Sequence, residues 1–80
     1  MKINEPILRT LAAAGSVREL VAQRVPAGSG FAWVLTVRVG IAEAPLERQR
    51  GGAREFKSLD AVAALVDSLG LAGMSVRFHL

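Results

Sequence analysis

The sequence predicts a single α+β domain over residues 1–80, with a small antiparallel sheet of three to five strands and two helices on one face. Three observations predict this class. Apolar residues recur at helical spacing in two segments and alternate with polar residues in two others. Glycine and proline lie at the boundaries between these segments. The expected order is helix, strand, strand, an uncertain strand pair, helix and strand.

The first helix is expected over residues 5–14. Asn4 is a favourable N-cap, and Pro6 falls in the first turn, where its missing N–H costs nothing. Ile3, just before the cap, is placed to pack on Leu8 as a hydrophobic staple. The local sequence therefore predicts both where this helix begins and which side it buries.

A β-hairpin is expected next, with strands over residues 17–25 and 31–39 joined by a turn at residues 26–30. In the second strand one face is wholly apolar, and it consists of Phe31, Trp33, Leu35, Val37 and Val39. The other face is half apolar, which predicts that this is the central strand. Trp33 is expected in the core rather than as a stacking platform.

Two alternatives remain open for residues 41–52. Pro45 excludes a regular central strand at this point. Residues 46–49 are expected to pair as an edge strand with residues 53–57, across a turn at Gly51 and Gly52. The rival interpretation is a helical turn that begins near Pro45.

Ser58 is a favourable N-cap for a second helix, and Asp60 lies in its first turn, where the helix dipole favours a negative charge. The apolar stripe of this helix, which Gly70 ends, consists of Leu59, Val62, Val66 and Leu69.

A last strand is expected at the end of the sequence because its residues alternate strictly. Its apolar face consists of Met74, Val76, Phe78 and Leu80. Both helices are expected to cover the apolar side of the sheet. The other side is then expected to carry Arg38 and Arg77, together with Arg18 or Arg24.

Composition limits the class of protein. A domain of 80 residues buries only about 60% of its unfolded surface, yet 51% of these residues are hydrophobic. This excess predicts a homodimer. The absence of cysteine excludes disulfides and thiolate sites and fits a cytoplasmic location, and no segment has the ~20 apolar residues of a membrane span.

The residues available for catalysis are few. His79 is the only histidine, and neither tyrosine nor cysteine is present. Asp60 and Asp67 are two helical turns apart, roughly 10 Å, and are expected to be solvated charges. We therefore expect no enzyme, no metal site and no cofactor.

The net charge is +3, from eight arginines, two lysines and seven acidic residues. Arg48, Arg50, Arg54 and Lys57 form the main basic cluster, and we predict that they are a recognition surface. On an extended hairpin the three arginines would project to one side, toward a protein partner or a phosphate backbone. The alternatives are solvated charges or ion pairs between subunits.

Adjacent glycines also suggest a phosphate-binding loop, because their backbone N–H groups can surround an anion. The glycine frame around Gly51 and Gly52 is shorter than in such loops and does not lead directly into a helix. A tight turn with positive φ angles is therefore the favoured interpretation.

The stretch RGGAREFKSLDAVAALVDSLG followed by SVRFHL, with MKINEPILRTLAAAG before them, resembles the small plasmid-encoded proteins of the ParC family, which are associated with partition. The similarity spans most of the chain. It implies an accessory role in plasmid partition or mobile-element maintenance, through partners such as partition proteins. It assigns no residue a function.

Overall fold

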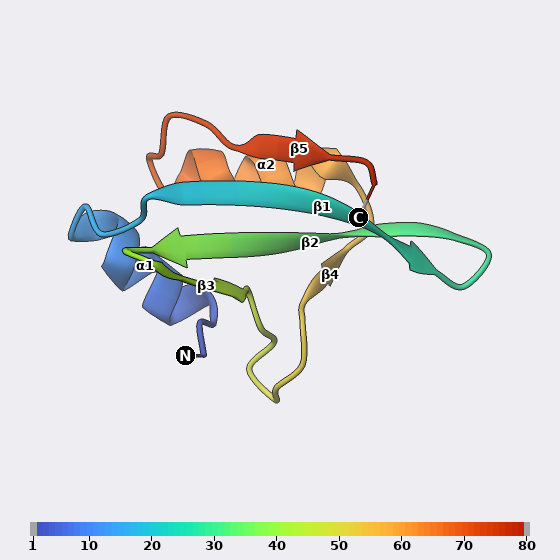
Figure 1. Ribbon diagram of the computed structural model, residues 1–80, viewed down its shortest axis with the longest axis horizontal. Helices are drawn as coiled ribbons and strands as arrows, with labels where there is room; N and C mark the ends of the chain where they lie inside the picture. Colours follow the sequence, from blue (N-terminus) through green and yellow to red (C-terminus); the bar gives the residue numbers. More distant parts are fainter. Residues whose placement is uncertain (1, 80) are drawn as a thin grey trace.

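The hairpin of β1 (Glu19–Ala27) and β2 (Gly30–Val39) forms the centre of the sheet in the computed structural model, which describes residues 2–79 (Figure 1). Only Gly28 and Ser29 lie between the paired residues Ala27 and Gly30, so the turn is tighter than the sequence predicted. Gly28 has a φ of 59°, a conformation that glycine adopts without steric cost.

The central position predicted for β2 is confirmed. On one side it pairs with β1, and on the other it pairs with two short strands in succession, β3 (Ala42–Pro45) and β4 (Glu55–Phe56). Pro45 is the last residue of an edge strand, a position that needs no backbone N–H. The alternative of a helical turn beginning near Pro45 was therefore wrong.

The last strand differs from the prediction. It is β5 (Ser75–Arg77), and it runs parallel to β1 at the opposite edge of the sheet, so the sheet is mixed rather than wholly antiparallel. All three of its residues are exposed, and Phe78 after it is 53% exposed. Alternation predicted a strand correctly, but it overestimated both the strand's length and its burial.

The helices form as their caps predict. In α1 (Glu5–Ala13) the Asn4 side chain accepts a hydrogen bond from the backbone N–H of Ile7. In α2 (Leu59–Ser68) the Ser58 hydroxyl accepts one from Ala61. Each bond satisfies an N–H that the helix itself leaves without a partner.

Both helices pack against the same side of the sheet and share one core with it. The core consists mainly of Ile3, Leu8, Leu20, Ala22, Trp33, Leu35, Val37, Leu46, Phe56, Val62, Leu65 and Val66. Ile3 and Leu8 are both fully buried, as the staple predicts. The α+β class, the element order and the core position of Trp33 are confirmed.

Two side chains near the hairpin tip, which projects past α2 in Figure 1, differ from the prediction. Phe31 was expected in the core but is 60% exposed. Arg24 lies directly opposite Trp33 and therefore on the helix side of the sheet, not on the other side. Arg24 is half-buried and packs against the rings of Phe31 and Phe78.

Candidate functional site: the arginine loop

The chain leaves the sheet between β3 and β4 and forms a short excursion, the arginine loop (residues 46–54). Its first residue, Leu46, is fully buried and donates its N–H to the carbonyl of Leu35 at 2.7 Å. Glu47 donates its N–H to the carbonyl of Ile3, also at 2.7 Å. The segment before α1 and the central strand therefore both fix the base of the loop.

The two sides of the loop also bond to each other. Arg54 donates its N–H to Leu46 at 2.8 Å, and Arg48 donates to Gly52 at 2.9 Å. The edge pairing predicted here is confirmed only as one isolated bridge, between Glu47 and Ala53. The turn beyond that bridge is too tight to continue the ladder.

The paired glycines act as the sequence indicated. Gly51 and Gly52 have φ angles of 90° and 79°. The N–H of Gly51 donates to the carbonyl of Arg48 at 3.0 Å, so an amide needed for anion binding is already used within the turn. The geometry favours a tight turn over a phosphate-binding loop.

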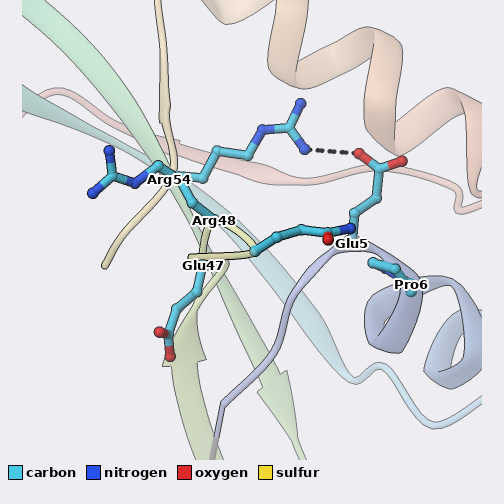
Figure 2. A pocket seen from close by; sticks show the side chains of 6 residues that line it. Glu5, Pro6, Glu47, Arg48 and Arg54 are labelled. Carbon is cyan, nitrogen blue, oxygen red and sulfur yellow. Dashed lines mark hydrogen bonds and ion pairs between the residues drawn. The ribbon is translucent and has the colours of Figure 1, made fainter. Parts of the chain in front are cut away.

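Arg54 joins the loop to α1. Its Nη1 donates to Glu5 Oε1 at 2.7 Å (Figure 2). Its guanidinium carbon also lies 4.6 Å from the centre of the Phe56 ring. Glu5 also accepts from Arg9 at 3.3 Å. The hydrogen bond from Arg54 is the main cause that lowers the pKa of the Glu5 carboxyl, against the opposing effect of burial.

Arg48 points the other way. In Figure 2 its guanidinium lies on the opposite side from that of Arg54, so the arginines do not all project to one side as predicted. Arg48 Nε donates to the carbonyl of Gly51 at 3.3 Å. A Cβ on Gly52 would lie 2.9 Å from the end of the same side chain. The Arg48 side chain thus folds back against its own turn through Nε, and the residue remains exposed.

Arg50 and Lys57 are exposed, Arg50 within the turn and Lys57 after β4. A shallow groove beside the turn brings Arg48 and Arg50 together with Lys2, which the sequence gave no reason to include. Among residues 2–79, no carboxylate lies within ion-pair distance of these four side chains. The groove can therefore contact carboxylate or phosphate oxygens.

The other candidate groups are scattered. His79, Asp60 and Asp67 are all exposed. The described part of the chain holds no group of three or more His, Cys, Asp or Glu side chains close enough to bind a metal ion. Nor does it contain a helix long and apolar enough to cross a bilayer.

The family comparison now adds to this geometry. The model of the ParC-like family matches residues 3–79, nearly the whole chain. The chain belongs to the ParC-like family. No curated protein and no solved structure matched it.

Two residues of this ParC-like chain belong to the site although sequence reasoning did not place them there. The sequence indicated Glu5 only as the first residue of the expected helix and assigned no role to Lys2. Neither has a local signal, because both meet the arginine loop only through the pairing of Ile3 with Leu46. The family match covers α1 and the arginine loop but begins after Lys2.

Proposed function

We propose that this protein is a non-catalytic accessory protein of plasmid partition or mobile-element maintenance, and that it acts by binding another protein through the arginine loop. Membership of the ParC-like family supports the biological setting. The observation that carries the binding role is the contrast between the arginines. Arg54 is held by Glu5, whereas Arg48 and Arg50 stand on a fixed backbone with donors to spare.

The contrast favours recognition because a fixed backbone lowers the entropy that binding must overcome. The base of the loop is bonded to Ile3 and Leu35, and its sides are bonded to each other. The entropic cost that remains on binding is the ordering of the Arg48 and Arg50 side chains. Their planar guanidinium groups suit the carboxylates of an acidic protein surface. Arg54 acts as a positioning residue, and Lys2 and Lys57 extend the positive field.

The test is co-precipitation with the partition ATPase and the DNA-binding protein encoded on the same replicon. We expect one of them to be retained, and we expect Arg48→Ala with Arg50→Ala to abolish most of that retention. The matched control is Arg18→Ala with Arg38→Ala, which removes the same charge elsewhere on the sheet. Equal loss in both double variants would show that net charge alone matters and would overturn the role of the loop.

A second candidate function is direct binding of DNA by the same surface. The observation that favours it is the grouping of Lys2, Arg48 and Arg50 around one groove, where these three cations outnumber the one acidic residue, Glu47. Fluorescence anisotropy on duplex DNA at increasing salt tests it. Each phosphate contact is expected to contribute about −0.9 to the slope of log affinity against log salt. No binding at low salt, or binding unchanged by the two alanines, counts against it.

A further inference from the structure

We propose that the outer edge of β5 binds an extended, acidic and apolar segment of a partner protein, which adds to the sheet as a further strand. This surface lies at the opposite edge of the sheet from the arginine loop, since the strand order is β3, β2, β1, β5. The inference therefore does not depend on the function proposed for that loop, and each can fail without the other.

The backbone of β5 has an edge that is free within residues 2–79, because β5 pairs with β1 alone. The carbonyls of Arg77 and His79 accept from Nε2 of Gln23 on β1, at 3.5 and 3.2 Å. They therefore turn toward β1. Neighbouring residues of a strand turn their N–H and C=O groups to opposite edges, so those of Val76 face outward. An incoming strand would find this donor and acceptor ready.

Apolar side chains line the same edge on the helix side of the sheet. Val76 is 37% exposed and Phe78 is 53% exposed. The Phe78 ring meets the Trp33 ring edge to face, with centroids 5.8 Å apart. Phe78 is thus held in place by the core although half of it faces water. Apolar side chains of an added strand would cover this surface.

Charge selects the partner. Arg77 lies on the other side of the sheet and is exposed, and no ion pair to it is formed within the described residues. The guanidinium carbon of Arg24 lies 4.3 Å from the Phe31 ring centre and 5.3 Å from that of Phe78. Arg24 Nε is buried without a hydrogen-bond partner. Acidic residues at alternate positions of an added strand would lie on the same side of the sheet as Arg77 and supply the opposite charge that it lacks.

Other occupants fit less well. A second copy of this chain would bring the same two arginines against them. A single-stranded nucleic acid would stack its bases on exposed rings, but Arg24 already covers one face of Phe31 and approaches Phe78. Nucleic acid would also leave the outward N–H of Val76 unused. The free backbone edge therefore favours an extended peptide.

Amide hydrogen exchange on the full-length chain tests the proposal. The probe is a capped peptide that alternates valine and glutamate over roughly six residues, enough to span the edge. At a peptide concentration of ten times Kd, exchange of the Val76 amide is expected to slow about tenfold. The Arg77 amide, which faces β1, serves as the internal reference and is expected to change little.

Two controls separate charge from strand addition. A peptide with lysine in place of glutamate is expected to bind at least about fivefold more weakly, and Arg77→Glu is expected to weaken the glutamate peptide by a similar factor. Arg18→Glu makes the same charge change at an exposed residue outside both proposed surfaces and is expected to leave peptide binding unchanged.

Three outcomes would overturn the proposal. In the first, the peptide binds without slowing exchange at Val76. In the second, the glutamate and lysine peptides bind equally. In the third, the Val76 amide is already protected in proportion to protein concentration, which would assign the edge to a second copy. Slowed exchange at this edge with single-stranded DNA but not with the peptide would instead assign the patch to nucleic acid.

Discussion

Arg54 Nη1 lies 2.7 Å from Glu5 Oε1, and this ion pair joins the arginine loop to the first helix across 49 positions of sequence. Both side chains are about one-third exposed, so solvent screens the pair and its own contribution to stability is at most ~1 kcal/mol. Its importance is positional, because it draws Arg54 away from Arg48 (Figure 2).

Replacing Glu5 by glutamine is expected to lower the free energy of unfolding by about 1 kcal/mol, since the change also removes an acidic residue from the first turn of α1. Thermal unfolding measures this as a fall in Tm of roughly 4–8 °C. Glu55→Gln is the matched control, because Glu55 is exposed and its carboxylate forms no ion pair within residues 2–79. An equal fall in both variants would contradict the role of the pair.

The same carboxyl predicts a dependence on pH. The pKa of Glu5 is lowered in the folded protein from its usual value of 4.5, so its stabilising contribution is complete above that value. The contribution is lost as the pH falls through the lower, folded pKa. The wild-type protein should therefore lose more stability than Glu5→Gln between about pH 5 and pH 3. Denaturant titrations at each pH compare them, and parallel curves would contradict the prediction.

The turn of the arginine loop needs both glycines. Gly51→Ala forces a side chain into a φ of 90°, which is expected to cost about 1 kcal/mol. Gly52→Ala adds a contact at 2.9 Å with the end of Arg48, and so displaces that guanidinium as well. Gly73→Ala is the control, because its added Cβ meets nothing within 4 Å. Unfolding in denaturant measures all three, and the prediction fails if Gly73→Ala is the most destabilised.

The core should respond to a cavity in its centre. Leu35 is fully buried in the core, and Leu35→Ala is expected to lower the free energy of unfolding by about 2–5 kcal/mol. Ile41, which is fully exposed, is the matched control, and Ile41→Ala is expected to change it by less than about 0.5 kcal/mol. Similar losses of unfolding free energy in both variants would contradict the placement of Leu35 in the core and Ile41 on the surface.

The homodimer predicted from composition stays a prediction. The exposed large apolar side chains that could close such an interface are Ile7, Phe31, Ile41, Val76 and Phe78. Light scattering after size-exclusion chromatography, repeated across dilution, should give a mass of two chains. A monomer at micromolar concentration would contradict the predicted homodimer.

Local signals predicted most of the fold. Asn4 and Ser58 marked both helix starts correctly because capping is a contact within one turn of chain. Alternation identified β2 because a strand with neighbours on both sides buries one face along most of its length. Gly51 and Gly52 were read correctly because a positive φ is a property of the residue itself.

Long-range placement could not be predicted in the same way. Periodicity shows that Phe31 and Phe78 are apolar and in phase with a core face, but not that the fold leaves both of them more than half exposed. The parallel direction of β5 depends on the path from α2 back to β1. The pairing of Glu5 with Arg54 exists only once Ile3 lies beside Leu46, so the geometry of the arginine loop required the tertiary structure.

The most direct measurement of the proposed function is the rate of plasmid loss in cells whose plasmid carries the gene for this chain beside partition genes. Deleting the gene should raise the rate of loss, and Arg48→Ala with Arg50→Ala should raise it to the same level while the protein remains folded. Arg18→Ala with Arg38→Ala should leave inheritance near normal. A deletion that leaves plasmid inheritance unchanged would contradict the role in partition.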